Sequence, residues 1–256
     1  LAMFMAAIEA TIVSTAIPSI VADLGGFSLF SWVFSIYLLM QAITVPIYGK
    51  LADLYVRKPV FAIGVSIFLI GSILCGLSEH MPMLIVSRLI QGMGAGAVQP
   101  IATTIIGDIY TIEERAKIQG YLGSVWGISS VVGPTVGGLI VTYTHWSWIF
   151  WLNIPLGIIA VLGIILYLHE DVERKQHTID YLGSSLLLIA ISTLMVALIQ
   201  GGNAWPWFSI PSMALLFTFI FSFALFIWQE TRAEEPVMPL HIWKNRVIGV
   251  ANIASF

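Results

Sequence analysis

The chain has 256 residues, of which 58% are hydrophobic and 10% are charged. Soluble domains carry about 25% charged residues, so this deficit predicts lipid rather than water as the surrounding solvent. The net charge of −3 and the lack of a basic stripe argue against nucleic acid as a partner. Cys75 is the only cysteine, which excludes a disulfide within the chain and a cysteine-based metal site.

The apolar segments predict an all-α integral membrane protein. A membrane-spanning helix needs about 20 largely apolar residues. By this criterion the sequence predicts the start of a ninth helix near residue 246 and eight complete spans before it, near 1–22, 28–50, 58–78, 81–107, 115–143, 147–168, 181–200 and 208–229. Glycines, prolines and a Trp205-Pro206-Trp207 turn separate the spans.

The basic residues alternate between connections. The connections around Asp23, Glu79, His145 and Asn203 carry no Lys or Arg. The other connections hold the basic residues, namely Lys50, Arg57, Lys58, Arg115, Lys117, Arg174, Lys175, Arg232, Lys244 and Arg246. Lys and Arg beside membrane spans stay on the cytoplasmic side. We therefore expect a multi-pass protein of the cytoplasmic membrane whose even-numbered connections lie inside the cell.

The first predicted span contains one acidic residue, Glu9. A charged group at mid-membrane is costly and is therefore a functional hypothesis by default. A carboxylate there could bind a proton or attract a cationic compound, and competition between the two is the simplest form of antiport. The alternative is a structural hydrogen bond to Thr11, Ser14 or a neighbouring helix.

The connection after the second span brings together Gly49, Asp53, Arg57 and Lys58. An acid at a helix end beside two cations can bridge neighbouring helices at the cytoplasmic surface. Asp108 stands at the end of the fourth span and could extend such a chain of charges. We expect this group to act in gating.

Arg88 is the one basic residue that lies inside an apolar stretch. Arginine does not lose its proton in proteins. A fixed positive charge could make proton release from a nearby carboxylate depend on conformation, so we expect Arg88, like Glu9, to take part in proton coupling. The alternative is a structural pairing with backbone carbonyls, Gln91 or Gln119.

Glycines punctuate the fourth and fifth spans. Gly92–Ala97 fits a dinucleotide-binding pattern with alanine last, but that pattern requires a preceding strand, so close helix packing is the expected role. In the fifth span, Gly133 and Pro134 predict a kink that could act as a hinge or as a seal against proton leak, and the alternative is a purely architectural bend. Gly137 and Gly138 predict tight contact with a neighbouring helix.

A few polar or aromatic residues inside the spans could line a substrate cavity, because aromatic faces suit lipophilic cations. These residues are Tyr37, Gln41, Gln99 and Trp126. The alternative is simple packing between helices. The histidines have no ligand spacing, so we expect no metal site and no cofactor.

Taken in order, these segments resemble motifs of the major facilitator superfamily. The segments are Gly49-Lys-Leu-Ala-Asp53 with Arg57-Lys58, Arg88 with Gln91-Gly92, and Gly133-Pro134 with Gly137-Gly138. Two more resemble the drug:proton antiporters with fourteen spans, namely Ile8-Glu9-Ala-Thr11 and Trp146-Ser-Trp148-Ile-Phe150 with Asn153, Pro155 and Gly157.

The resemblance implies a six-helix N-terminal transport domain at 1–168 and a cytoplasmic loop at 169–180. It further implies two inserted helices at 181–229, then a loop and the start of a truncated C-terminal domain at 230–256. We expect a fragment of an exporter, not an enzyme, that exchanges protons for small lipophilic or cationic compounds by alternating access. Its other partner is membrane lipid.

The chain departs from the family pattern at several positions. Leu54 replaces the usual arginine and Val56 the usual glycine in the loop, Ser147 replaces an arginine, and Glu9 replaces an aspartate. Two alternatives remain open. One is an exporter of a single metabolite or siderophore, and the other is a membrane sensor or scaffold that does not transport.

Overall fold

The computed structural model describes residues 1–168, 180–202 and 204–233, without the side chains of Asp53, Leu54 and Tyr181. The described residues contain eight helices that are long and apolar enough to cross a membrane, which confirms the predicted all-α fold. The chain divides into two compact units, Leu1–Arg174 and Lys175–Phe256, and each is described by itself. The predicted ninth helix lies outside the described residues.

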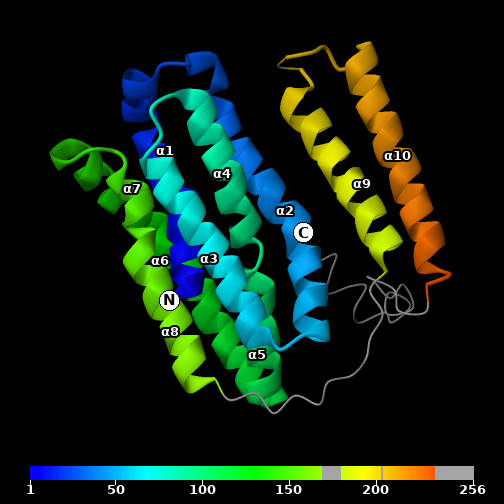
Figure 1. Cartoon of the computed structure of the whole chain (residues 1–256), viewed down its shortest axis with the longest axis horizontal. Helices are drawn as coiled ribbons and strands as arrows, with labels where there is room; N and C mark the ends of the chain where they lie inside the picture. The colour runs from blue at the N-terminus through cyan, green and yellow to red at the C-terminus, as the bar shows by residue number, and fades with distance from the viewer. Residues whose placement is uncertain (169–179, 203, 234–256) are drawn as a thin grey trace. The chain divides into compact units, whose positions relative to one another are not determined.

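The first unit holds six of the eight candidate spans. Figure 1 shows them as a bundle in which α1 is enclosed by its neighbours. The helical elements of this unit are α1 Ala2–Leu24, η1 Phe27–Leu29, α2 Phe30–Leu54, α3 Arg57–Gly76, α4 Met81–Ala95, α5 Val98–Ile109, α6 Ile112–Tyr143, α7 Trp148–Trp151 and α8 Asn153–Tyr167.

Two spans that were predicted as single helices are interrupted in the structure. The fourth divides into α4 and α5 at Gly96 and Ala97, and the sixth into α7 and α8 at Leu152. Proline has no amide hydrogen, so Pro100 and Pro155 leave the carbonyls four residues earlier without their helical partner. Each division therefore lies one turn before a proline.

Local sequence explains where several helices begin. The amide of Met83 donates to His80 Nδ1 at 3.1 Å, which caps the start of α4. Thr111 and Glu114 form a reciprocal capping box at the start of α6. Arg115 donates to the carbonyls of Tyr110 and Gly107, and so caps the end of α5.

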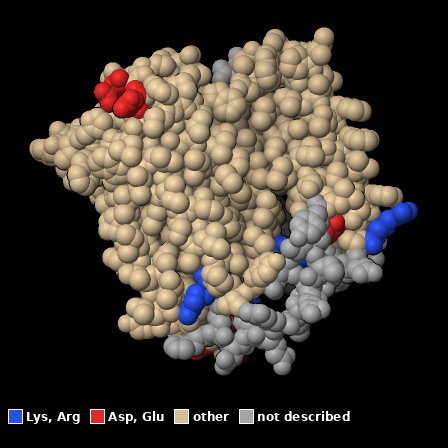
Figure 2. Space-filling model, in the orientation of Figure 1, with Lys and Arg blue, Asp and Glu red and all other residues tan. Residues whose placement is uncertain are grey.

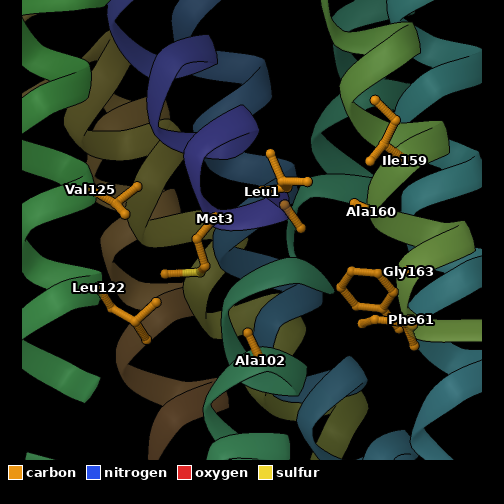
Figure 3. A pocket seen from close by; sticks show the side chains of 11 residues that line it. Leu1, Met3, Phe61, Ala102, Leu122, Val125, Ile159, Ala160 and Gly163 are labelled. Carbon is orange, nitrogen blue, oxygen red and sulfur yellow. The ribbon is translucent and has the colours of Figure 1, made fainter. Parts of the chain in front are cut away.

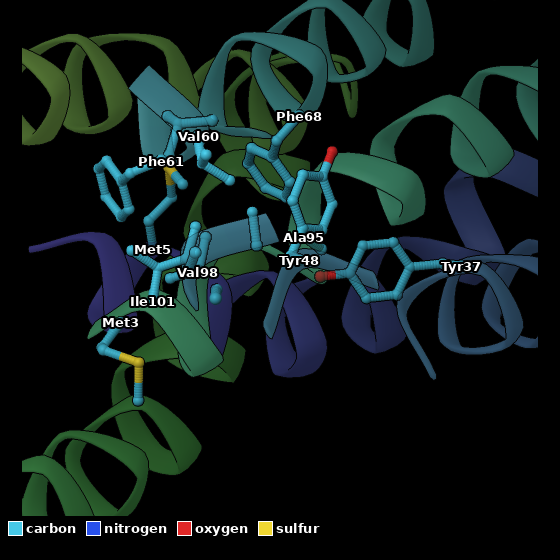
Figure 4. Close-up of a cluster of buried hydrophobic side chains, with 14 residues drawn as sticks. Met3, Met5, Tyr37, Tyr48, Val60, Phe61, Phe68, Ala95, Val98 and Ile101 are labelled. Carbon is cyan, nitrogen blue, oxygen red and sulfur yellow. The ribbon is translucent and has the colours of Figure 1, made fainter. Parts of the chain in front are cut away.

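The core of the first unit consists of two clusters of buried apolar side chains. One contains Met5, Phe61 and Phe68 and is drawn in Figure 4. The other contains Ile12 and Phe150 with residues of α3 and α4. Many large apolar side chains remain exposed on the outer helix faces, as expected where lipid is the solvent.

The charged residues visible on the surface of the first unit gather at its two ends. In the view of Figure 2, acidic atoms lie at one end of this unit, Lys and Arg atoms lie toward the opposite end, and the band between them is uncharged. Such a distribution fits helices that cross a membrane.

The second unit is a hairpin of α9 Tyr181–Gln200 and α10 Ile210–Glu230. Asp180 caps α9 by accepting from the amide of Gly183 at 2.9 Å. The same carboxylate oxygen accepts from Gln229 Nε2 at 3.1 Å, which ties the start of α9 to the end of α10. Gly202, at a φ of 77°, supplies the left-handed backbone conformation in the connecting turn.

Candidate functional site

Helix α1 places Glu9 inside the first unit, where the residue has 0% exposed surface. The helix is held against α6 by close contacts, because Gly133 and Gly137 leave room for Thr11, Ile12 and Thr15. The hydroxyl of Thr11 donates to the carbonyl of Ser129 in α6 at 3.1 Å.

Glu9 forms an ion pair with Arg88 of α4, which is 1% exposed. Arg88 Nη1 donates to Glu9 Oε1. The guanidinium also donates from Nε to the carbonyl of Val33 at 3.0 Å and from Nη1 to Gln91 Oε1 at 2.8 Å. Its central carbon lies 4.1 Å from the ring centre of Tyr37, a cation–π contact.

The hydrogen bonds continue from Arg88 into α3. Gln91 Nε2 donates to Ser72 Oγ at 2.9 Å, and Ser72 Oγ donates to the carbonyl of Phe68 at 3.0 Å. Cys75 Sγ lies 3.5 Å from Gln91 Oε1. The network therefore joins α1, α2, α3 and α4 through side chains that are all buried.

Asn153, the first residue of α8, completes the surroundings of Glu9. Its Nδ2 donates to Glu9 Oε2 at 2.6 Å. Both carboxylate oxygens thus accept from a buried side chain, one charged and one neutral. The structure shows that the sequence motif around Asn153 points into the same site as the motifs around Glu9 and Arg88.

The ion pair lies between the two apolar clusters. Helices α1 and α2 each contribute residues to both clusters. Taking two charges out of water costs several kcal/mol per ion, and only good geometry and further hydrogen bonds offset that cost. Here the bonds from Asn153, Gln91 and the Val33 carbonyl supply them.

Glycines bring the backbone of α4 close to two helices. A Cβ at Gly92 would meet the backbone of Tyr37 in α2, and one at Gly94 would meet the backbone of Phe68 in α3. A Cβ at Gly96 would overlap the Thr44 hydroxyl. The expected role of this glycine series in close helix packing is confirmed.

The charge group predicted at the connection between the second and third spans is partly assembled. Arg57, at the start of α3, forms an ion pair with Asp108, at the end of α5. Lys58 Nζ donates to the carbonyl of Ile165 near the end of α8 at 2.8 Å. The side chain of Asp53 lies outside the described residues, so its place in a charge relay stays a prediction. A Cβ at Gly49 would meet no atom of the described residues within 4 Å.

At the opposite end, a polar cluster that the sequence did not indicate joins α1 to the connection between α6 and α7. Asp23 Oδ2 accepts from the indole of Trp146 at 2.8 Å and lies 3.2 Å from His145 Nε2. His145 Nδ1 lies 2.8 Å from Ser147 Oγ. Ser147, one of the departures from the family pattern, is therefore a member of this cluster.

The four residues predicted to line a substrate cavity lie in different surroundings. Tyr37 is 1% exposed and packs under Arg88, so the structure places it in the core rather than on an open surface. Gln41 is half-buried, Gln99 is exposed and Trp126 is 40% exposed. Gly138 was expected to pack tightly like Gly137, but a Cβ at this position would meet no described atom within 4 Å.

A separate cavity of about 310 Å³ opens near the start of α1. Its lining is apolar, as Figure 3 shows, and comes from α1, α3, α5, α6 and α8. Met3, Phe61 and Val125 are among the side chains that surround it. None of the four residues predicted to line a substrate cavity contributes to this one.

Comparison with known sequences gives consistent matches. The family model described as Major Facilitator Superfamily matches residues 1–239. Multidrug resistance protein 3 of Bacillus subtilis (strain 168) is 43% identical over 256 residues, which are 100% of this chain and 50% of that protein. Multidrug transporter protein MdtP of the same organism is 40% identical and is matched over 47% of its length. The chain thus spans about half the length of these relatives.

Solved structures show the same fold. The crystal structure of the human organic anion transporter MFSD10 (TETRAN) matches with a TM-score of 0.62 at 15% identity, covering 83% of this chain and 57% of that one. The POT family transporter PepTSo matches with a TM-score of 0.52 at 14% identity, covering 91% and 54%. At these identities the likeness concerns the fold alone.

Proposed function

Because the chain belongs to the Major Facilitator Superfamily, we propose that it forms the N-terminal part of a proton-coupled exporter in the cytoplasmic membrane. Residues 1–168 act as the six-helix transport domain and 181–229 as an inserted helix pair. The substrates are lipophilic, often cationic compounds, moved by alternating access. The names of two relatives, a multidrug resistance protein and a multidrug transporter, support this substrate class.

The observation that carries the proposal is the buried ion pair of Glu9 and Arg88. Arg88 keeps its charge at any physiological pH, so Glu9 is the member of the pair that can change charge. When Glu9 binds a proton, Arg88 loses its counter-ion while it is still 1% exposed. Protonation of Glu9 therefore removes the attraction between the two charges at the centre of the bundle.

A buried charge without a counter-ion is strongly unfavourable. Arg88 also contacts Val33 and Tyr37 of α2, and Gln91 links it to Ser72 of α3. Protonation of Glu9 therefore favours a conformation in which Arg88 has different contacts with α2 and α3. A ligand or proton shifts a conformational equilibrium by its different affinity for the two states, and this pair supplies such a difference.

Glu9 has no exposed surface, so direct competition between proton and substrate at its carboxylate, as expected from the sequence, does not fit this conformation. We assign the proton to Glu9 and the substrate to more exposed positions such as Gln41, Gln99 and Trp126. The coupling is then indirect, through Arg88 and the helices it contacts.

The proton gradient suffices as an energy source. One elementary charge moving down 100 mV releases about 2.3 kcal/mol, which supports roughly a fiftyfold gradient of a neutral substrate. Arg57 and Asp108 join α3 to α5 at the cytoplasmic edge, and we assign this pair to gating.

The test uses the full-length protein in inverted vesicles with an acidified lumen. Adding ethidium should alkalinise the lumen as protons leave, and Glu9→Gln should abolish the response. An equal response from the parent and the variant would move proton coupling away from Glu9. A parent that responds to no compound in a panel of lipophilic cations would contradict multidrug export.

A further inference from the structure

The two oxygens of the Glu9 carboxylate have chemically different partners. Oε1 accepts from Arg88 Nη1, whereas Oε2 accepts from Asn153 Nδ2 at 2.6 Å. Asn153 is 1% exposed, so its amide faces the carboxylate away from bulk solvent. Because their partners differ, the two oxygens differ in how well they can hold a proton.

Arg88 can only donate hydrogen bonds, because a guanidinium has five N–H donors and no acceptor. A proton on Oε1 would therefore point at another donor. The amide of Asn153 has both kinds of group, two N–H donors and a carbonyl oxygen. It can donate to an ionised carboxylate and, after a half-turn of the amide, accept from a protonated one.

We propose that Asn153 is a positioning residue that directs the transported proton to Oε2 of Glu9. The proposal rests on the coupling role of Glu9 proposed above. In the step, a hydronium ion transfers a proton to Oε2 and leaves as a water molecule, and the carboxylate loses its charge. The hydrogen bond from Nδ2 to Oε2 breaks, and a bond from the new Oε2–H to the Asn153 carbonyl oxygen replaces it. Release of the proton reverses both changes.

Among the described residues, the carboxylate of Glu9 accepts hydrogen bonds from two side chains, those of Arg88 and Asn153. The nearby titratable side chains contact other members of the network: Tyr37 of α2 lies under Arg88, and Cys75 of α3 lies 3.5 Å from Gln91 Oε1. Helix α6 faces α1 with Ser129 and with glycines, none of which titrates. Asp108 of α5 is paired with Arg57 at the cytoplasmic edge. Asn153 is the neutral partner of Glu9 Oε2.

The start of α8 holds Asn153 in a defined place. The residue follows the interruption at Leu152, and two contacts on α3 flank it. A Cβ at Gly76 would overlap Trp151, and a Cβ at Gly157 would meet Leu69. The indole of Trp151 against Gly76 and the backbone of Gly157 against Leu69 thus fix the chain on both sides of Asn153 to α3.

The test is an infrared pH titration of the purified full-length protein, in which the protonated carboxyl of Glu9 is identified by the band that Glu9→Gln removes. In Asn153→Leu, the band should move to higher wavenumber, because the protonated carboxyl of Glu9 has lost the amide oxygen that accepted its hydrogen bond.

Asn153→Asp provides a second variant of nearly the same size. Its carboxyl oxygen can still accept a hydrogen bond from protonated Glu9, so the band should stay closer to its parent position than in Asn153→Leu. Ser78→Ala is the matched control, since it removes a hydrogen bond from a buried α3-side hydroxyl, Ser78 Oγ to the carbonyl of Leu74, that lies outside the network of Glu9. It should leave the band unmoved.

The outcomes separate this proposal from the one on which it rests. If Glu9→Gln removes the band and blocks proton release while the band keeps its parent position in Asn153→Leu, the role of Asn153 is wrong and that of Glu9 stands. An equal shift of the band in Ser78→Ala would reduce Asn153 to one of many structural contacts. A parent without any Glu9-dependent band would overturn both proposals.

Discussion

The hydroxyl of Thr11 in α1 lies where a side chain on Gly133 of α6 would have to lie. The same hydroxyl donates to the carbonyl of Ser129 at 3.1 Å, one helical turn before Gly133. Glycine at this position thus allows the helix that carries Glu9 to be hydrogen-bonded to the backbone of α6.

Gly133→Ala should therefore destabilise the protein. The added methyl group overlaps Thr11 Oγ1, and overpacking of this kind costs about 1–3 kcal/mol. The unfolding temperature of the purified full-length protein should fall. Gly138→Ala is the control, because no described atom lies within 4 Å of its Cβ position. Equal unfolding temperatures for the two variants would show that α1 and α6 can separate freely here.

The ion pair of Glu9 and Arg88 should behave as a coupled unit. Removing one partner leaves a buried charge unpaired, so Glu9→Leu and Arg88→Met should each destabilise by about 3–5 kcal/mol. The double variant should be less destabilised than the sum of the two. Denaturation measurements on the full-length protein provide the comparison, and strictly additive losses would indicate that the two side chains do not interact.

The pair of Arg57 and Asp108 should matter more for transport than for stability. The two side chains are 21% and 46% exposed, and exposed pairs contribute at most about 1 kcal/mol. Asp108→Asn should lower ethidium efflux while shifting the unfolding temperature little. The exchange variant Arg57→Asp with Asp108→Arg should recover part of the efflux. If it performs worse than either single variant, the charges act separately.

The hydrogen bond from Trp146 to Asp23 should contribute to stability. Trp146 is 3% exposed, and a buried donor that loses its acceptor costs about 1–3 kcal/mol. Asp23→Ala should therefore lower the unfolding temperature of the purified full-length protein. His145→Gln is the control, because it keeps the bond from Trp146 to Asp23 and should lower the unfolding temperature less. Equal decreases for the two variants would show that this bond does not stabilise the cluster.

The two charged members of the site are evident from the sequence because charges within membrane spans are rare. Their contact with each other is not, since Glu9 and Arg88 are 79 positions apart and helix periodicity relates only near neighbours. Asn153, at 144 positions from Glu9, appeared only as one letter of a motif. A neutral amide in an apolar span carries a weaker signal than a charge.

The helices themselves were largely predictable, because spans are long apolar segments of defined length. The two interruptions were not, since hydropathy averages over about 20 residues and is insensitive to a single missing hydrogen bond. Gly137 and Gly138 show a similar limit. Adjacent residues of a helix point about 100° apart, so only Gly137 faces α1 while Gly138 contacts none of the described residues.

The interruption at Gly96 and Ala97 has a mechanical consequence. Above it, α4 carries Arg88 and is clamped between α2 and α3 by its glycines. Below it, α5 carries Asp108. The junction keeps a long bond of 3.4 Å from Gly96 to Gly92 and a tightened one from Ala97 to Gly94. Backbone hydrogen bonding is therefore weaker and less regular at this junction than within α4 or α5, which makes it the point between Arg88 and Asp108 at which a bend costs least.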